Sequence, residues 1–449
     1  SMPRNRSVYR CAECGAEHPR WAGRCDSCGE WNTLVEEPVR RARKSGDRLG
    51  AGAEPVLLSR IASERLHRWP TGLAEFDFAV GGGLVPGSLV LVGGEPGIGK
   101  STLLLQCAAR LVAGGVPVLY VSGEESPEQV RLRADRIGEE AGAVYLLPEV
   151  RVDAILSRAA SLHSRVVFVD SIQTMYTDDL EGAPGNVGQV RECAARLMRF
   201  AKESGAAVVL VGHVTRGGII AGPKTLEHIV DTVLYFEDDG GSDFRILRAV
   251  KNRFGSVDEV GVFEMTGAGL RPVENPSAAF LSGRQTNTPG SAVAALMEGS
   301  RPVLVEIQAL ASKTGFGTPQ RVATGLEHRR LAVLLAVLER RAGLVFRDLD
   351  VFVNVTGGVR LIETASDLAV VAALSSTLHD IALPADAMFV GEVGLGGEVR
   401  PVGGVERRIA EAERLGFRQV FLPGRSRPST ALDLVSINHV SELWKRIAA

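Results

Sequence analysis

The stretch that decides the fold spans residues 90–102 and reads VLVGGEPGIGKST. Within it, residues 94–101 fill every fixed position of the pattern G-x-x-x-x-G-K-[ST]. A short β-type apolar run at 88–92 precedes the glycines, and a helix-type run at 102–111 follows them. Strand, glycine loop and helix therefore come in the order that the pattern requires. The stretch predicts a phosphate-binding loop rather than a glycine-rich turn that matches by chance.

Each residue type in this loop has a chemical reason. Phosphate oxygens need several converging N–H donors, and a glycine backbone without side-chain bulk can wrap that closely at the start of a helix. We expect Lys100 to reach the β- and γ-phosphates of ATP, and the Ser101 hydroxyl to bind Mg²⁺. The predicted nucleotide-binding residues are Gly94, Glu95, Pro96, Gly97, Ile98, Gly99, Lys100, Ser101 and Thr102.

Two carboxylates follow the next predicted strand, which spans residues 116–122. In an open α/β sheet, the ligand crevice lies at the carboxyl ends of the strands. There Glu124 can orient or deprotonate an attacking water, with Glu125 as its neighbour. The alternative is that the two carboxylates only cap the helix that begins around Ser126 and Pro127.

Another acid ends the buried strand that is predicted at residues 165–171. This is the form of a Walker B element, so we expect Asp170 to hold Mg²⁺ through water. A further strand, 206–215, places His213 and Thr215 where they could sense phosphate, although a histidine at a strand end is more often structural. The predicted catalytic residues are Lys100, Glu124 and Asp170.

Two further segments are candidates for contact with a substrate or a partner. Residues 177–188, TDDLEGAPGNVG, predict a mobile substrate loop before a helix at 189–204. After strands at 230–237 and 244–250, an exposed turn is predicted. Its cations can act as arginine fingers on a neighbouring subunit's nucleotide or contact nucleic-acid phosphates. The residues of this turn are Lys251, Asn252, Arg253, Phe254 and Gly255.

Four of the six cysteines fall within the first 28 residues, as two Cys-x-x-Cys pairs. A glycine follows each pair, which lets each turn bring two sulfurs toward one ion. Four thiolates suit tetrahedral Zn²⁺, and so short a segment needs a metal to be stable. Two disulfides are the alternative, which a cytosolic location disfavours. The predicted zinc ligands are Cys11, Cys14, Cys25 and Cys28.

Two aromatic residues and a basic run accompany this segment. Trp21 and Trp31 either stack on nucleic-acid bases or cover the metal site. The basic run at 40–44 lies in a predicted linker and is either part of a solvated tether or a phosphate contact. The other cysteines, Cys107 and Cys193, occupy apolar or helical contexts and are expected to be buried free thiols.

The composition sets the outer limits of what the chain can be. A length of 449 residues with 45% hydrophobic residues accommodates several domains with large cores. A formal net charge of −2 argues against a general polyanion binder, so any nucleic-acid surface must be local. The sequence has no long apolar run and no visible signal peptide, so we expect no transmembrane helix and a cytoplasmic location.

Together these features resemble the bacterial RadA (Sms) family of RecA-related DNA-repair ATPases. The resemblance spans essentially the whole chain and rests on the four-cysteine knuckle, the phosphate loop, YVSGEES at 120–126, GHVT at 212–215 and KNRFG at 251–255. It implies an α/β fold with a RecA-like P-loop ATPase core that uses ATP, Mg²⁺ and Zn²⁺. It also implies a hexameric ring that moves on single-stranded DNA and promotes strand exchange and branch migration on branched intermediates, together with RecA.

The C-terminal part is similar to the Lon-type protease domain, an α+β fold, through GEVGLGGEVRPVGG at 391–404. That family uses a serine–lysine dyad. Here Ala365 stands at the serine position and Arg408 at the lysine position, while Ser366 is one residue out of register and about 100° away on a helix. Alanine cannot attack a carbonyl, and arginine stays protonated near neutral pH. We therefore expect a scaffold without protease activity.

The predicted organisation is a C4 zinc finger in 1–36, a basic linker in 37–69, a RecA-like ATPase domain in 70–280 and a Lon-protease-like domain in 281–449. The leading hypothesis is a DNA-dependent ring ATPase, with Lys251, Arg253 and the 177–188 loop lining the channel. An ATP-dependent protease is one alternative. A signalling ATPase of the KaiC type is another; it shares the double glutamate but needs neither a zinc knuckle nor KNRFG.

Overall fold

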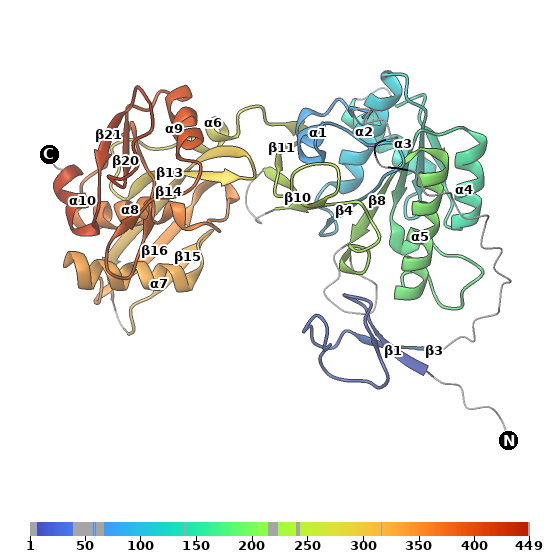
Figure 1. Cartoon of the computed structure of the whole chain (residues 1–449), viewed down its shortest axis with the longest axis horizontal. Coiled ribbons are helices and arrows are strands. Elements are labelled where there is room, and N and C mark those ends of the chain that lie inside the picture. Colours follow the sequence, from blue (N-terminus) through green and yellow to red (C-terminus); the bar gives the residue numbers. More distant parts are fainter. Residues whose placement is uncertain are drawn as a thin grey trace. The chain divides into compact units, whose positions relative to one another are not determined.

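A computed structural model describes residues 7–38, 57, 59, 67–138, 141–213, 223–238, 243–315 and 317–447 (Figure 1). Thr215 and the basic run at 40–44 lie outside the described residues. The chain divides into two compact units, each of which is described by itself. The first comprises residues 1–237, 246–257 and 265–272, and the second comprises residues 238–245, 258–264 and 273–449.

The ATPase sheet is built from short apolar strands. They are β4 (Leu89–Gly94), β5 (Val118–Ser122), β6 (Tyr145–Leu147), β7 (Val166–Asp170), β8 (Ala207–His213), β9 (Thr232–Glu237), β10 (Phe244–Asn252), β11 (Val260–Thr266) and β12 (Gly269–Pro272). Their order is β12-β11-β10-β9-β4-β8-β7-β5-β6. The strands from β9 to β6 are parallel, and β10 returns antiparallel to β9. All residues of β4, β5 and β7 are buried, as expected for central strands covered on both faces.

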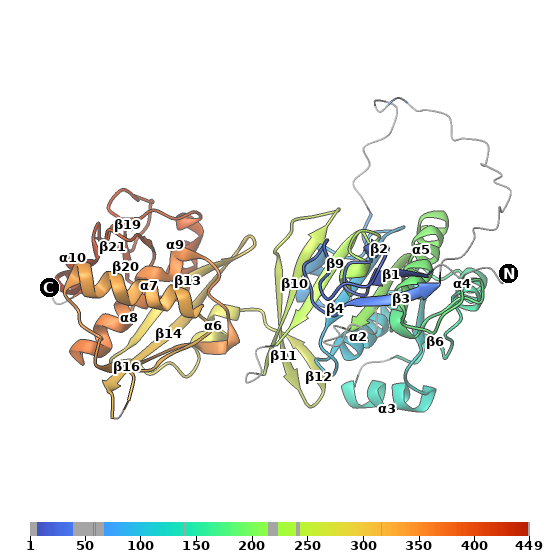
Figure 2. The same ribbon diagram turned by 90° about the horizontal axis from the view of Figure 1, so that it is seen from below.

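Helices cover both faces of this sheet. They are α1 (Ala74–Val80), α2 (Lys100–Ala113), α3 (Pro127–Ile137), α4 (Val152–Ser161) and α5 (Val187–Ser204). One core joins β4, β7 and β8 to the apolar sides of α4 and α5, and α2 and α3 lie on the opposite face (Figure 2). Because β4 runs directly into the glycine loop and α2, the loop is held at the carboxyl edge of the sheet.

The zinc knuckle is a small antiparallel sheet in the order β2-β1-β3, made of β1 (Ser7–Cys11), β2 (Glu17–His18) and β3 (Leu34–Pro38). Its own buried core holds only Cys11, Cys25 and Leu34. The knuckle packs on the ATPase core through Ala12, which joins the cluster of α4, α5 and the sheet. With so little apolar surface of its own, this element needs its metal site to be stable.

The second unit contains a seven-stranded mixed sheet in the order β15-β16-β14-β13-β17-β20-β21. Its strands are β13 (Ser291–Glu298), β14 (Arg301–Lys313), β15 (Arg321–Thr324), β16 (Leu349–Val355), β17 (Ala387–Phe389), β20 (Gln419–Leu422) and β21 (Asp433–Ser436), with a separate pair β18 (Glu392–Val393) and β19 (Val399–Arg400). Its helices are α6 (Pro276–Leu281), α7 (His328–Val337), α8 (Asp367–His379), α9 (Val405–Arg414) and α10 (Val440–Ile447). The buried helix α8 packs on β13 and β14.

Most predicted elements are confirmed, and the exceptions have physical reasons. The predicted turn at 251–256 begins too early: Lys251 and Asn252 belong to β10, where they pair with Val233 and Thr232 after a bulge that follows Ala249. In the second unit, residues 321–324 pair with β16 as the short strand β15, and α7 begins at His328. No helix in the described part of the chain is long and apolar enough to cross a bilayer.

Candidate nucleotide-binding and metal-binding sites

The glycine loop joins β4 to α2 and takes backbone conformations that other residues rarely adopt. Gly97 has φ +80° and Gly99 has φ +114°. A Cβ atom at Gly99 would lie 2.8 Å from Cε of Met265, so a side chain there would strain the backbone and displace the end of Met265. The spacing of the glycines therefore reflects both the wrapping of the loop and its packing.

Lys100 is 3% exposed and folds back onto the loop. Its Nζ donates to the carbonyl oxygens of Gly94 at 2.8 Å and Glu95 at 2.7 Å. Burial lowers the pKa of Lys100 to about 8, although the negative charges of Asp170 and Glu124 act in the opposite direction. The cation thus lies near both acids that the sequence singled out.

Asp170 ends β7 beside the first turn of α2. Its Oδ2 accepts a hydrogen bond of 2.9 Å from the hydroxyl of Tyr120, a fully buried residue of β5. Burial raises the pKa of Asp170, while hydrogen bonds to Ser101 and Tyr120 partly offset that effect. Ser101 and Asp170 therefore meet, as two residues that would hold Mg²⁺ between them must.

Glu124 follows β5 and receives two hydrogen bonds on one oxygen. Ser171 donates from its hydroxyl, and Nε2 of His213 lies 3.2 Å away. The hydrogen bond from His213 is the main reason that the pKa of Glu124 is lowered to about 2. Glu125 instead pairs with Arg133 of α3. The two neighbouring glutamates thus have separate partners, and Glu124 is the one beside Asp170 and Lys100.

Neither glutamate caps the helix that follows. Ser126 is the N-cap of α3: its hydroxyl accepts from the backbone N–H of Gln129, and the Gln129 side chain accepts from the backbone N–H of Ser126. This reciprocal arrangement is a capping box. Glu124 and Glu125 are therefore not needed at the helix end, which removes the structural alternative for the pair.

His213 ends β8 and contacts Glu124 directly. Its backbone carbonyl accepts a hydrogen bond of 3.2 Å from Nε2 of Gln173, while its buried Nδ1 has no partner among the described residues. Sequence reasoning missed three partners in this network, Tyr120, Ser171 and Gln173. Only the order of the strands, with β7 between β5 and β8, brings them together.

The KNRFG segment is bound to the ATPase core by several contacts. Nζ of Lys251 donates to the carbonyl oxygens of Glu227 and Val230 at 2.5 and 2.8 Å. Nη1 of Arg253 lies 3.3 Å from Asp231, a 4% exposed acid that also accepts from the backbone N–H of Leu89. The side chain of Arg253 is nevertheless 53% exposed. Lys251 is thus engaged within its own chain, and Arg253 has the exposed cation.

The same segment has two further contacts with the start of the domain. Asn252 donates to the carbonyl of Val80 at 3.1 Å, at the end of α1. The carbonyl of Phe254 accepts from Arg68. A side chain at Gly255 would approach Nδ2 of Asn252 to 2.9 Å. The pentapeptide is therefore a packed element of the fold, not a loose turn.

KNRFG lies beside the amino-terminal ends of the central strands, whereas the glycine loop of the same chain follows a carboxyl end. In the parallel pair β4–β9, Thr232 is level with Val90 and Phe236 is level with Gly94. Asn252 is level with Thr232, at the amino-terminal ends of these strands. The glycine loop follows the carboxyl end of β4. From the rise per residue of a strand, that end is about 15 Å from the level of Asn252. Arg253 of one chain therefore lies far from the phosphate site of the same chain.

The 177–188 segment is anchored at several points. The Gln189 side chain accepts from the backbone N–H of Thr177 and donates to the carbonyls of Thr177, Leu180 and Gly182. Arg196 pairs with Asp179 at 2.7 Å and with Asp153 of α4 at 2.6 Å. The first half of the segment, which was predicted to be mobile, is thus fastened to α4 and α5.

The four cysteines of the knuckle come together as one donor set. Their Sγ atoms all lie within 4.8 Å of one another, with Cys11 3.6 Å from Cys28 and Cys14 3.6 Å from Cys25. Tetrahedral zinc–thiolate bonds place sulfurs about 3.8 Å apart. No disulfide links the cysteines, and Cys107 and Cys193 are buried free thiols as predicted. The donor set fits zinc and excludes the disulfide alternative.

Residues of α5 and of the segment 223–225 attach the knuckle to the ATPase domain. The hydroxyl of Thr225 donates to the carbonyl of Ala12 at 2.8 Å, between the first two cysteines. Nη1 of Arg191, from α5, lies 3.5 Å from the carbonyl of Gly15. Lys224 lies 4.0 Å from Glu30. The metal site is therefore attached to the unit that contains the phosphate loop.

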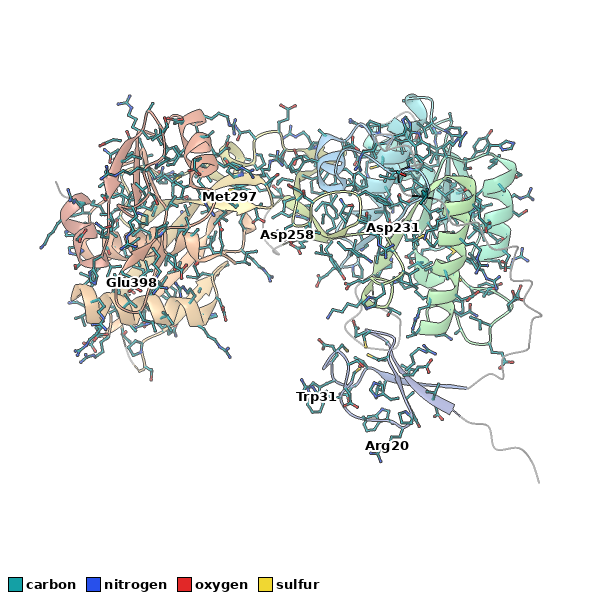
Figure 3. All side chains as sticks on the ribbon, viewed as in Figure 1. Arg20, Trp31, Asp231, Asp258, Met297 and Glu398 are labelled. Atoms are coloured by element: carbon teal, nitrogen blue, oxygen red, sulfur yellow. The ribbon has the colours of Figure 1, made fainter. Side chains whose placement is uncertain are left out.

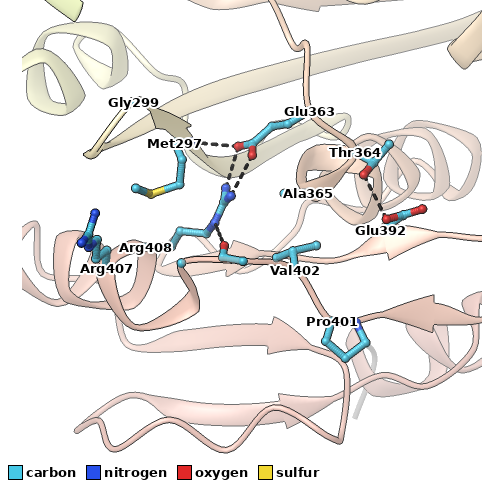
Figure 4. A pocket seen from close by; sticks show the side chains of 12 residues that line it. Met297, Gly299, Glu363, Thr364, Ala365, Glu392, Pro401, Val402, Arg407 and Arg408 are labelled. Atoms are coloured by element: carbon cyan, nitrogen blue, oxygen red, sulfur yellow. Dashed lines mark hydrogen bonds and ion pairs between the residues drawn. The ribbon is translucent and has the colours of Figure 1, made fainter. Parts of the chain in front are cut away.

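The second unit contains an open pocket of about 690 Å³ at the position of the Lon-type dyad (Figure 4). Arg408 is 2% exposed and makes a two-pronged ion pair with Glu363, at 2.7 and 2.8 Å. Ala365 lines the pocket, whereas the hydroxyl of Ser366 donates to the carbonyl of Glu363. Arg408, which the resemblance to the Lon-type domain places at the lysine position, is thus held in an ion pair.

Family models match three parts of the chain. A rubredoxin metal binding domain matches residues 9–36, an AAA domain matches residues 70–218, and the Lon protease (S16) C-terminal proteolytic domain matches residues 340–438. A KaiC-like protein from Pyrococcus horikoshii matches 46% of this chain with 21% identity and a TM-score of 0.39. The fold and the sites define a P-loop ATPase with a RecA-like core, a four-cysteine zinc ribbon and a Lon-like C-terminal domain.

Full-length relatives identify the family. DNA repair protein RadA of Pseudomonas aeruginosa is 50% identical over 98% of both chains. The protein of that name from Bacillus subtilis is 48% identical over 98% of both chains. That from Escherichia coli is 49% identical over 97% of this chain and 96% of its own. The chain belongs to the DNA repair protein RadA family.

Proposed function

We propose that the chain is a DNA-dependent ATPase of recombinational repair in the cytoplasm, which moves on single-stranded DNA and promotes strand exchange and branch migration beside RecA. The observation that carries the proposal is the convergence of Lys100, Asp170 and Glu124 at the carboxyl ends of β4, β7 and β5. A cation for phosphate, a metal-holding acid and a carboxylate for water are the parts that phosphoryl transfer needs. The family membership supplies DNA repair as the setting.

The proposed steps follow from these contacts. Lys100 leaves the carbonyls of Gly94 and Glu95 to meet the β- and γ-phosphates of ATP. Ser101 and Asp170 would hold Mg²⁺ when it is bound. Glu124 aligns the attacking water, with Ser171 and His213 fixing its carboxylate. Mg²⁺ would supply charge neutralisation across the phosphates, and the protein side chains position the reactants.

A ring explains the place of KNRFG. Arg253 is exposed but lies at the sheet edge away from its own glycine loop. In a closed head-to-tail ring, that edge can face the nucleotide of the next subunit. We propose that Arg253 acts there as an arginine finger in a hexamer, and that Lys251 holds the KNRFG segment in place through its hydrogen bonds. Single-stranded and branched DNA would pass through the channel.

The remaining parts have supporting roles in the proposal. Residues 1–36 form a Zn²⁺-stabilised finger and 37–69 a linker, while 70–280 hydrolyse ATP. Residues 281–449 are a pseudo-protease that assembles the ring. The pocket supports inactivity because Ala365 has no nucleophilic oxygen and Arg408 is held by Glu363. Casein degradation by the purified chain would overturn that part alone.

One purification tests the central proposal. ATP hydrolysis is measured with and without single-stranded DNA over a range of salt concentrations, and the mass in solution is measured with nucleotide. We expect DNA to stimulate hydrolysis, the affinity for DNA to fall steeply with salt, and the mass to correspond to six chains. Lys100→Ala is the matched inactive control. Equal hydrolysis with and without DNA would reject DNA dependence, and autophosphorylation in its place would favour the signalling alternative.

A further inference from the structure

Trp21 and Trp31 are not part of the zinc knuckle's interior. They are 57% and 68% exposed. The buried core consists of Cys11, Cys25 and Leu34, and the partly buried residues that pack against it are Tyr9, Cys14, Ala16, Ala22 and Cys28. The indoles therefore lie outside this buried core, and most of each aromatic surface faces solvent.

The two indoles form one surface with an arginine. A Cβ at Gly23 would lie 3.7 Å from Cζ3 of Trp31 and 3.9 Å from Cη2 of Trp21, so both rings lie beside this glycine. The Arg24 guanidinium lies 5.9 Å from the ring centroid of Trp31 and donates to the carbonyl of Gly29 at 2.8 Å. We call Trp21, Arg24 and Trp31 the indole platform. Trp31 and the exposed Arg20 stand out from the knuckle in Figure 3.

Three carboxylates of the knuckle have basic side chains nearby. Glu17 pairs with Arg10 on the knuckle sheet. Glu30 lies 4.0 Å from Lys224 of the ATPase domain, and Asp26 lies 3.6 Å from His18. Arg20 and Arg24 provide the positive charge next to the indoles, although residues 7–38 as a whole contain more acidic than basic side chains, so the contact with phosphates must be local to these two arginines.

We propose that the indole platform binds single-stranded DNA, with bases stacked on Trp21 and Trp31 and phosphates held by Arg20 and Arg24. This inference rests on the proposed function and adds a second DNA contact, outside the phosphate-loop domain. Every base has a flat aromatic face, so stacking tolerates any sequence, as a motor on single strands requires. Duplex DNA offers no such faces, since its bases are already stacked.

A nucleic acid fits this surface better than a protein partner does. Protein hot spots also use tryptophan and arginine, but these residues lie at the centre of an interface whose surrounding contacts exclude water. In the described part of the knuckle, Trp21 and Trp31 are the only large hydrophobic residues that are exposed. Two isolated indoles beside two arginines are instead the combination that single-strand binders use, stacking surface plus backbone charge.

The experiment separates base stacking from phosphate contact. The zinc-loaded full chain is titrated with fluorescein-labelled dT30 and with an abasic strand of equal length and charge. The wild type should bind dT30 more tightly, by about fivefold or more for each stacked base. Trp21→Ala/Trp31→Ala should lose this preference, whereas Trp21→Phe/Trp31→Phe should keep most of it. Tyr145→Ala, which removes an exposed aromatic ring of β6, is the matched control.

Zinc content and ATP hydrolysis without DNA report whether the variants fold, and both should equal those of the wild type. If the double alanine variant keeps the preference for dT30, the platform does not stack bases. If the variant binds DNA normally but no longer acts with a RecA-type recombinase, the platform is a protein-docking surface, which also overturns the inference. If the wild type binds neither strand, the proposed function itself fails.

Discussion

Lys100 has a role that its motif predicts and a pKa that its surroundings in the fold determine. The motif predicts a cation for phosphate, and the structure adds that this cation is buried among carbonyls of its own loop. Burial brings the pKa of its ammonium to about 8, close to physiological pH. The charge that we propose for ATP binding is therefore sensitive to mild alkali, which no sequence pattern indicates.

The lowered pKa of Lys100 predicts that the affinity for ATP depends on pH. The pKa of Lys100 is lowered, so the ammonium is charged below pH 8 and becomes neutral as the pH rises through about 8. Only the charged form attracts phosphate. Affinity for ATP should be level from pH 6.5 to 7.5 and fall by up to about tenfold per unit above pH 8. Equilibrium titration with a fluorescent ATP analogue measures it, and Lys100→Arg should bind without this slope. A flat wild-type curve would contradict the prediction.

Glu124 carries the second residue-scale prediction. The hydrogen bond from His213 is the main reason that its pKa is about 2, so His213→Ala should raise that pKa toward the ordinary value for glutamate. In the proposed mechanism, the form of Glu124 that activates water is the carboxylate. In the wild type, kcat should stay constant down to pH 5, whereas the variant should lose activity as the pH falls from 6 to 4.5. Steady-state kinetics should show little change in KM for ATP.

Two further variants serve as controls for the test of His213. His213→Gln keeps a donor and should retain most of the wild-type profile. Glu124→Gln should retain ATP binding and lose at least about a hundredfold in kcat, the usual size of a general-base contribution. If His213→Ala lowers kcat equally at every pH, His213 orients the carboxylate without setting its pKa.

The motif residues could be predicted because each has an obligatory chemistry at a fixed spacing. Their partners could not. Tyr120 and Ser171 contact the predicted acids only because β7 lies between β5 and β8, and strand order is a property of the whole sheet. The same limit applies to Asp231, which holds both Leu89 and Arg253 across strands that are far apart in sequence.

At the scale of elements, apolar periodicity located most strands and helices but did not show how far the ladder between β9 and β10 extends. The end of β10 was misjudged because Lys251 and Asn252 look like turn residues, although the ladder to β9 continues through them. The cysteine spacing, by contrast, predicted a whole element. Its three-residue core leaves the metal site as the main source of its stability.

Zinc removal should therefore unfold one element and spare the rest. After chelation, hydrogen exchange measured by mass spectrometry should show loss of protection in residues 7–38, while β4 and α2 keep theirs, because their cores are independent of the metal. Thr225→Val, which removes the hydrogen bond to Ala12, should leave zinc bound but loosen the docking of the knuckle. Global unfolding on chelation would contradict this division.

The buried ion pair of the second unit supports another prediction. Arg408→Ala leaves Glu363 without its partner in a partly buried site, which should cost about 3–5 kcal/mol. Replacing both residues by apolar ones of similar size, Arg408→Met with Glu363→Leu, should be nearly neutral by the same reasoning. Differential scanning calorimetry of the full chain measures both, and Arg407→Ala, at the exposed neighbouring position, is the control. Equal melting of all three variants would remove the pair's structural role.

At the scale of the whole molecule, the family and the three kinds of domain could be predicted from motifs, because each motif marks one fold. The contacts between subunits could not be predicted, because the surfaces that form a ring have no fixed sequence pattern. Within a chain, Arg253 lies near the amino-terminal ends of the strands, away from the phosphate site of the same chain. Whether Arg253 acts on a neighbouring subunit can therefore be tested with mixtures of variants.

Two inactive variants should restore each other if Arg253 acts on a neighbouring subunit. Lys100→Ala abolishes the phosphate site but keeps the finger, and Arg253→Ala does the reverse. In mixed rings, a subunit with Arg253→Ala that follows one with Lys100→Ala has an intact composite site, so an equal mixture should recover about a quarter of the wild-type ATPase sites. The rate is measured after dissociation and reassembly of the mixture. Because a finger that acted within its own chain would leave every site defective, a mixture as inactive as its components would exclude action between subunits.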